Sequence, residues 1–381
     1  MMEQARQWLL FGVVLFSVLG CGEEPTVPPE PLPEEPTPPT PVYWSATASL
    51  NEARWSHTAS LLPSGQVLVV GGLGGDGSEV LASAELYEPS TGTWSMTGKM
   101  IEPRVGHTAT VLPSGQVLVT GGHNARGTLA SSELYEPATG TWTSTGNLSE
   151  PRASHTAGLL PSGKVLIVGG RHEDLSPYGS VEEYEPAQGT WSLVASMPRT
   201  AWYPKATVLP SGKVLITGQP TDNNVTGYVV RYAPDTGSWQ TVGAPLIMNS
   251  HTCSLLPSGK VLCAGGYGLA LVGPPLSQAS LYDEATNSWK TIARMGLGRA
   301  SHTATVLPSG HVLVLGGSAG SEVLDSAELY EPDQDLWTEV GRMSEPRSGY
   351  TATVLRSGQV LVAGGRRGTS TPLAVAELWA R

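Results

Sequence analysis

Residues 107–122 read HTATVLPSGQVLVTGG, and a near copy of this stretch occurs six more times along the chain. Two runs rich in β-branched residues flank Pro113-Ser114-Gly115, where proline presets φ and glycine can adopt a positive φ. The stretch therefore predicts two antiparallel strands, over 107–112 and 116–122, joined by a tight turn.

A second hairpin follows the first in each of the first six copies. In this copy SSELYEP (131–137) and TWTST (141–145) flank a turn that ends in Gly140. The third strand carries an aromatic residue, and a tryptophan follows seven residues later in the fourth strand. These pairs are Tyr87/Trp94, Tyr135/Trp142, Tyr184/Trp191, Tyr232/Trp239, Tyr282/Trp289 and Tyr330/Trp337.

The copies recur at a regular interval. Their anchor position falls at His57, His107, His155, Pro204, His251, His302 and Tyr350, with periods of 47 to 51 residues. Four strands per unit of this length are typical of a β-propeller blade. The seventh copy ends at Trp379 without a fourth strand, and a spare strand precedes His57. We therefore predict an all-β, seven-bladed propeller of four-stranded antiparallel blades, closed by an N-terminal strand near 43–47 that completes the C-terminal blade.

The Gly-Gly pair, the Glu-Leu-Tyr strand and the tryptophan seven residues on resemble the kelch repeat. The resemblance covers residues 43–381 and implies a propeller fold. Kelch propellers serve as adaptors, glycan binders and enzymes alike, so the resemblance does not select a function.

The N-terminal residues predict export. An apolar run follows Arg6 and has the layout of a signal peptide over residues 1–20. Val18-Leu19-Gly20-Cys21 resembles a bacterial lipobox, which implies that Cys21 is lipidated; a plain secretory signal is the alternative. Residues 21–42 are rich in Pro and Glu and predict a linker. We expect a protein of the cell envelope, on the outer membrane or cell surface rather than the inner membrane, that touches a membrane only through its lipid.

The composition restricts the partners. The formal charge is −11 and the Lys and Arg residues are scattered, so no basic stripe is available to bind nucleic acid. No catalytic, phosphate-binding or calcium-binding motif occurs, and the loops between blades are short and alike. We expect a monomer and nominate no cofactor.

Two sets of repeated residues are predicted to be scaffold rather than site. The anchor histidines are spread around a ring, too far apart to share one metal ion, so we expect them to be buried and hydrogen-bonded between blades. An Arg and a Glu occur together or are missing together in each copy, which predicts structural ion pairs because a single buried charge is costly. The pairs are Arg54/Glu85, Arg104/Glu133, Arg152/Glu182, Arg299/Glu328 and Arg347/Glu377.

The fourth and fifth copies lack this ion pair and carry unusual residues instead. Trp202-Tyr203-Pro204 resembles a segment of the galactose oxidase and glyoxal oxidase propellers, in which such a tyrosine binds copper. The resemblance extends to Tyr203 alone: the chain has no Tyr-His dipeptide and no Cys in its first three blades. We also do not expect the extra domain that supplies a further histidine ligand in those oxidases. We therefore predict no metal site.

Cys253 and Cys263 flank the turn of the fifth copy. With a three-residue loop they face each other across the hairpin, and an oxidising compartment would permit a disulfide. Two buried thiols are the alternative, because a one-residue shift in register would separate the cysteines.

We expect a non-catalytic module that binds a protein or a carbohydrate at one face of the propeller. The predicted contacts are Trp202, Tyr203, Lys205 and Asn249, with a second, opposite face formed by His123, Arg171, His172 and Tyr267. A copper radical oxidase and a kelch-type sugar-acid epimerase are the alternatives, so whether the protein is an enzyme stays open.

Overall fold

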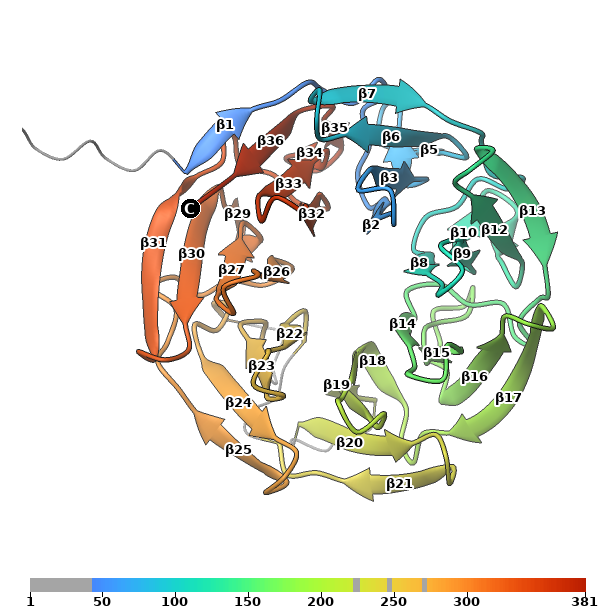
Figure 1. Cartoon of the computed structure of the whole chain (residues 1–381). Coiled ribbons are helices and arrows are strands. Elements are labelled where there is room, and N and C mark those ends of the chain that lie inside the picture. The colour runs from blue at the N-terminus through green and yellow to red at the C-terminus, as the bar shows by residue number, and fades with distance from the viewer. Residues whose placement is uncertain (1–42, 222–226, 245–248, 269–272) are drawn as a thin grey trace, which may run out of the picture. The chain divides into compact units, whose positions relative to one another are not determined.

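Each repeat folds into the predicted four-stranded antiparallel sheet. The computed structural model describes residues 43–221, 227–244, 249–268 and 273–381, and within these ranges it contains strands and no helix. Seven sheets stand in a ring, with each repeat contributing one blade (Figure 1). The predicted signal peptide, Cys21 and the linker lie outside the described residues.

The strands of the first four blades run in chain order from the centre of the ring to its rim. Blade one consists of β2 (Thr58–Leu61), β3 (Val67–Val70), β6 (Ala84–Glu88) and β7 (Thr93–Met96). Blade two consists of β8 (Thr108–Val111), β9 (Val117–Thr120), β12 (Ser132–Glu136) and β13 (Thr141–Thr145). Blade three consists of β14 (Thr156–Leu159), β15 (Val165–Val168), β16 (Ser180–Glu185) and β17 (Thr190–Ser196). Blade four consists of β18 (Ala201–Val208), β19 (Val214–Pro220), β20 (Tyr228–Ala233) and β21 (Ser238–Thr241).

Blades five and six follow the same plan, and blade seven differs in the origin of its outermost strand. Blade five consists of β22 (Thr252–Leu255), β23 (Val261–Ala264), β24 (Ala279–Asp283) and β25 (Ser288–Thr291). Blade six consists of β26 (Thr303–Val306), β27 (Val312–Leu315), β30 (Ser326–Glu331) and β31 (Leu336–Arg342). Blade seven takes β32 (Thr351–Val354), β33 (Val360–Ala363) and β36 (Ala376–Trp379) from the C-terminal end and β1 (Trp44–Ala46) from the other end.

Four short hairpins extend the loops between the second and third strands. They are β4–β5 (Leu73–Gly74, Glu79–Val80), β10–β11 (His123–Asn124, Gly127–Thr128), β28–β29 (Ser318–Ala319, Glu322–Val323) and β34–β35 (Arg366–Arg367, Thr371–Pro372). None of the described residues forms a helix that is long and apolar enough to cross a membrane.

The ring closes as predicted, through the first strand of the chain. β1 pairs antiparallel with β36, with Trp44 opposite Trp379 and Ala46 opposite Glu377. The Tyr43 ring stacks on that of Trp379 at a centroid distance of 6.1 Å. Figure 1 shows β1 as the outermost strand of the last blade, beside β36.

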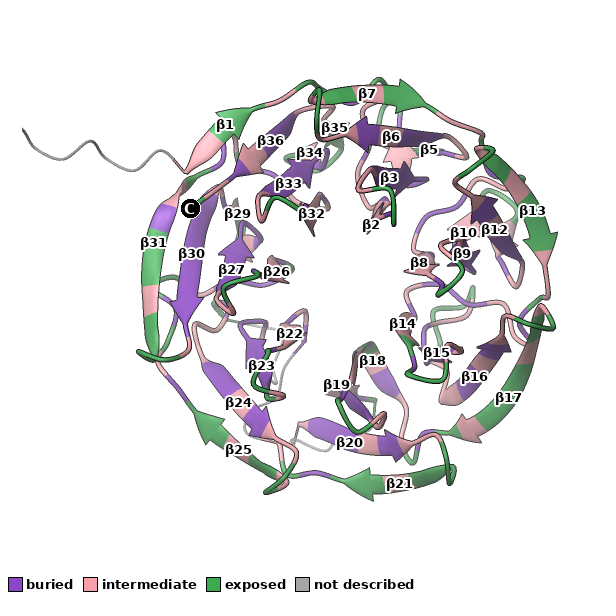
Figure 2. Cartoon of the chain, viewed as in Figure 1, coloured by how far each residue is buried: buried purple, intermediate pink, exposed green. Residues whose placement is uncertain are grey.

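The core lies between adjacent blades. The second strand of every blade is apolar and buried, whereas the outer strands present exposed residues to the rim (Figure 2). The conserved spacing of Tyr and Trp within each repeat places the two rings side by side, for example Tyr87 and Trp94 at 5.0 Å. The Tyr87 hydroxyl also bonds Thr47 Oγ1 at 2.8 Å, so the aromatic residues connect one blade to the next.

The Gly-Gly pair ends the second strand because the backbone of the incoming loop passes very close to it. Gly72 has a φ of +92°, and a Cβ there would lie 2.6 Å from the carbonyl oxygen of Trp55. Blade four differs: Gln219 takes the place of the second glycine, and β19 continues to Pro220 opposite an equally extended β18. This change makes the inner hairpin of blade four longer than that of any other blade.

Candidate functional site

The five Arg–Glu pairs predicted from the sequence lie within ion-pair distance. The nitrogen–oxygen distances are 3.1 Å for Arg54–Glu85 and 2.6 Å for Arg104–Glu133, Arg152–Glu182 and Arg299–Glu328, and Arg347 pairs with Glu377. All five guanidinium groups are buried. Each carboxylate also accepts at least one backbone N–H group from the segment that enters the blade, and Glu133 accepts two, from Ile101 and Glu102. These pairs therefore hold the inter-blade connections in place.

Blade four fills the same space without charge. Ala201 and Val230 occupy the Arg and Glu positions, and each is only 1% exposed. In blade five Ser280 replaces the glutamate and is buried, while Met248 lies outside the described residues. The two blades that carry the unusual residues therefore lack the clamp that fixes the entry to the other five.

The anchor histidines are buried between blades. Each donates or accepts one hydrogen bond through Nε2, and in four of them the partner is a threonine of the preceding blade's innermost strand. The bonds are His57–Thr351 at 3.0 Å, His107–Thr58 at 3.0 Å, His155–Thr108 at 2.8 Å and His302–Thr252 at 2.8 Å. Burial, followed by the charge of the neighbouring arginine, lowers the pKa of these four histidines to about 3.

We expect the stability of the protein to fall when the pH drops from about 6.5 toward 5. A histidine with a lowered pKa stays neutral in the fold while the unfolded chain binds a proton, so its contribution is complete above pH 6.5 and is lost on acidification. Replacing His107 by Gln removes one of the groups that take up a proton when the chain unfolds. The slope of unfolding free energy against pH should then decrease by about 1.4 kcal/mol per pH unit over this range. Parallel curves for the two proteins, measured by denaturant unfolding, would contradict the linkage.

The candidate contact residues all lie on one face of the ring. We call it the upper face: the end at which the innermost strands begin and the second strands finish. Isolated bridges join these two segments, pairing Val105 with His123, Ala153 with Arg171, and Asn249 with Tyr267. The prediction of a second, opposite face for His123, Arg171, His172 and Tyr267 was therefore wrong. In an antiparallel hairpin the start of one strand lies beside the end of the next.

Blade four interrupts the repeated geometry at the upper face. Trp202 pairs with Gln219 and Lys205 with Thr217, and the register shifts between these two pairs. Tyr203 lies within the shift, has a φ of +50° and is 49% exposed. Positive φ is unusual for a residue with a side chain and often marks a functional position. The local distortion thus presents the tyrosine ring to solvent.

A cavity of about 510 Å³ lies in the upper part of the central channel. Its wall is made by the first residues of the innermost strands in several blades, and it contains Tyr203, Pro204 and Lys205 from blade four. Threonines from four other blades line the same space: Thr58, Thr108, Thr156 and Thr351. The structure thus brings two of the predicted contact residues, Tyr203 and Lys205, into one site.

A smaller cleft of about 180 Å³ lies on the upper face between blades two and three. It is lined by three predicted contact residues, His123, Arg171 and His172, together with Glu173 and Leu175. Burial, followed by the charge of Arg171, lowers the pKa of His123. The cleft therefore offers a guanidinium group, two imidazoles, a carboxylate and an apolar side chain to a ligand.

Asn249 does not belong to either hollow. It is 4% exposed, and its Nδ2 donates to Gln219 Oε1 at 2.9 Å. This contact joins blade five to the unusual residue of blade four and removes Asn249 from the surface predicted from the sequence. Tyr267, directly paired with Asn249, lines neither of the two hollows.

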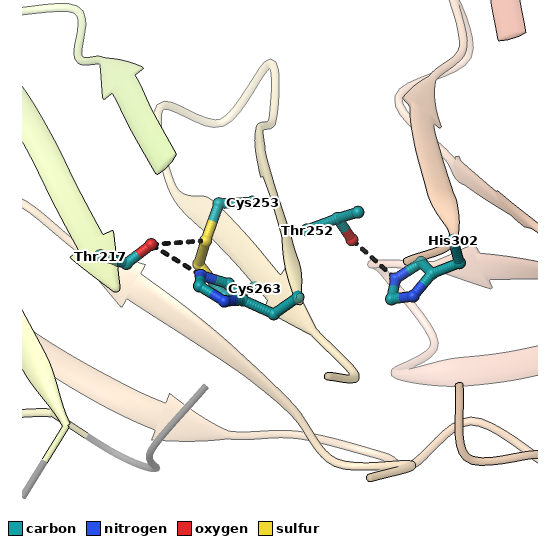
Figure 3. Close-up of a disulfide and its surroundings, with 6 residues drawn as sticks. Thr217, Thr252, Cys253, Cys263 and His302 are labelled. Atoms are coloured by element: carbon teal, nitrogen blue, oxygen red, sulfur yellow. Dashed lines mark hydrogen bonds between the residues drawn. A yellow bond between two sulfur atoms is a disulfide. The ribbon is translucent and has the colours of Figure 1, made fainter. Parts of the chain in front are cut away.

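Cys253 and Cys263 form a disulfide across the hairpin of β22 and β23. Thr217 of blade four lies beside it, with its Oγ1 3.5 Å from Cys253 Sγ and 2.7 Å from His251 Nε2 (Figure 3). Within the described residues, His251 and the two cysteines are the only three His, Cys, Asp or Glu side chains that approach one another as metal ligands would. With both sulfur atoms in the disulfide, no thiolate remains to bind a metal.

The lower face also contains hollows, but they repeat. One of about 460 Å³ lies between the Pro-Ser-Gly turns of blades three and four, and similar ones lie at the junctions of blades five and six and of blades six and seven. Their walls come from the same turn positions each time. They follow from the blade geometry, whereas the two upper hollows are lined by residues that differ from blade to blade, among them Lys205 and Arg171.

Sequence reasoning missed one contact on the upper face. The guanidinium carbon of Arg366 lies 4.0 Å from the centre of the Trp55 ring, a cation–π contact between blades seven and one. Both residues occupy repeated positions, two before the anchor and one after the Gly-Gly pair. Their contact follows from the bridge that joins these positions within a blade and from the closure of the ring.

The repeated ion pairs, aromatic pairs and Gly-Gly turns define a seven-bladed propeller. A family model described as the Kelch motif matches residues 54–101, 152–198 and 299–344, in blades one, three and six. The blades with the unusual residues, four and five, are not among the matched segments.

One solved structure with a similar fold is a fungal alcohol oxidase of the AA5 family in complex with copper. It shares 18% sequence identity and superposes with a TM-score of 0.71, covering 88% of this chain and 76% of that protein. At this identity the likeness concerns the fold. No curated protein matches the chain significantly.

Proposed function

We propose that this propeller is a non-catalytic module that binds a protein or carbohydrate ligand on its upper face, and that it is exported and lipid-anchored at the cell envelope. The observation that carries the binding role is the pair of upper hollows, whose linings include residues that differ from blade to blade, such as Tyr203 and Arg171. Residues that recur in every blade stabilise the fold. A binding site for an asymmetric ligand therefore has to be formed by residues that differ from one blade to the next.

The two upper hollows offer groups that are common in recognition sites. Tyr203 supplies an exposed aromatic ring, and Arg171 supplies a planar set of donors on the neighbouring blade. Tyrosine and arginine are enriched among residues that dominate binding energy. The polar lining of the smaller cleft favours the hydroxyl groups of a carbohydrate over an apolar ligand.

Copper chemistry, as named for the fungal oxidase, fits this site poorly. Tyr203 is the one residue of the channel cavity that matches a copper-binding segment, and the ammonium group of Lys205 lines the same space. A positive charge there disfavours a cation, and the histidine Nε2 atoms of the cavity wall are already bonded to threonine hydroxyls. Stoichiometric copper in the purified protein would overturn this assignment in favour of the oxidase.

Replacing Tyr203 or Arg171 by Ala should weaken ligand binding by about 30-fold each, the effect expected of a residue that dominates an interface. A glycan array and a pull-down from envelope extracts would identify the ligand, and titration would measure the affinity of each variant. Lys213→Ala, at a turn of the lower face, is the matched control and should bind as the parent does. Equal affinity in all three variants would exclude the upper face as the contact surface.

The anchor rests on the lipobox-like segment that ends at Cys21. Membrane fractionation followed by mass analysis of the mature N-terminus tests it. An N-terminus that carries a diacylglyceryl group on Cys21 is the expected result, and an unmodified N-terminus at another residue would contradict it.

A further inference from the structure

The residue after the anchor position shows a single exception around the ring. Six blades place a threonine there: Thr58, Thr108, Thr156, Thr252, Thr303 and Thr351. Blade four places Lys205 at this position, in the same register of the innermost strand. One ammonium group therefore replaces one hydroxyl in a ring of threonines around the channel.

The threonines of this ring connect neighbouring blades. Four bond the anchor histidine of the next blade, Thr303 contacts the Tyr350 hydroxyl at 3.4 Å, and Thr156 Oγ1 accepts the N–H of Ala206 at 3.1 Å. In blade four the contact differs, because His251, the anchor histidine of the next blade, bonds Thr217 on β19. Lys205 is thereby released from the inter-blade contact that holds the other six residues.

The released side chain lies in the channel cavity without a counterion. Lys205 is exposed to the cavity, whose lining residues include no Asp or Glu. Within the described part of the chain no carboxylate forms an ion pair with it. The surrounding protein nevertheless limits hydration, and this desolvation lowers the pKa of Lys205. The histidines at the wall are neutral, so Lys205 is the one formal charge of the lining.

We propose that the upper channel binds a small anion, a carboxylate or an inorganic oxyanion, on the ammonium group of Lys205. An uncompensated cation in a partly desolvated cavity gains most from an anion, and charge-assisted hydrogen bonds are the strong ones. Tyr203 lines the same cavity.

This inference deepens the proposed function, because it names the chemical class of one group that the upper face recognises. The inference rests on the proposed function only in one respect, namely that the anion belongs to the ligand that the upper face binds. The probes are therefore simple salts: if they bind but no macromolecule does, the proposed function fails alone, and if a macromolecule binds but no anion does, this inference fails alone.

The test is calorimetric titration of the mature protein with sodium sulfate and, separately, with sodium acetate at constant ionic strength. We expect one saturable site per chain for at least one of the two anions, and the stronger of them identifies an oxyanion or a carboxylate as the preferred class. Lys205→Thr, which restores the residue of the other six blades, should weaken binding by about 30-fold or more.

Three controls make the outcome decisive. Lys205→Arg keeps the charge and should retain binding within about fivefold, and Lys213→Thr removes a lower-face lysine and should change nothing. Circular dichroism checks that each variant folds; should Lys205→Thr fail this check, Lys205→Met takes its place. The absence of saturable binding by both anions, or equal affinity in the folded Lys205→Thr variant, would overturn the proposal.

Discussion

Replacing Glu328 by Ala is expected to lower the free energy of unfolding by about 3–5 kcal/mol, the cost of leaving a buried charge without its partner. The guanidinium group of Arg299 is 0% exposed and contacts Glu328 at 2.6 Å. The same carboxylate accepts the N–H groups of Gly296 and Leu297, which enter the blade. The substitution therefore leaves the buried guanidinium group without its carboxylate and two backbone N–H groups without their acceptor.

Blade six supplies a matched control for this experiment. Glu339 lies directly opposite Glu328 on the neighbouring strand, but its side chain is 58% exposed, as is most of its partner Arg342 at 62%. Exposed ion pairs contribute about 0–1 kcal/mol, so Glu339→Ala should be nearly neutral. Denaturant unfolding of the two variants and the parent gives the comparison. Similar losses at the two positions would show that burial of the pair does not decide its contribution.

The ion pairs could be predicted from the sequence because the repeat acts as an internal comparison. Arg and Glu are both absent from copy four, where Ala201 and Val230 stand, and such joint absence points to contact when one charge alone is costly. Ring closure was predictable for a similar reason: the seventh copy lacks a strand, and Trp44 offers one. Both inferences need only the count and spacing of the copies.

The geometry of the candidate site could not be predicted in the same way. Tyr203 lies in a register shift, and the residues next to it in the sequence do not indicate that its φ is positive. Asn249 is buried because Gln219 of the adjacent blade bonds it, a contact that depends on how blades four and five pack. The significance of Lys205 likewise depends on threonines that come from other blades. Single exceptions have no second copy within the chain against which they can be compared.

The strand β1 is held by the ladder with β36 and by two aromatic side chains. Trp44 and Tyr43 pack against the core cluster between blades six and seven, which includes Leu329, Val340 and Trp379. The backbone N–H of Ala380 also donates to Tyr43 at 2.8 Å. Because β1 and β36 come from opposite ends of the propeller, their pairing constrains every blade between them.

A chain that begins at residue 48 should therefore unfold at a markedly lower denaturant concentration than one that begins at residue 43. Burial of the two aromatic residues alone contributes on the order of 3 kcal/mol, and the lost ladder adds to it. Removal of β1 also leaves β36 as an open edge, which favours association between chains. Unfolding followed by tryptophan fluorescence, with light scattering to detect association, measures both effects. If the two chains unfolded at the same midpoint and stayed monomeric, closure by β1 would not stabilise the ring, and the blades would have to hold together through their lateral contacts alone.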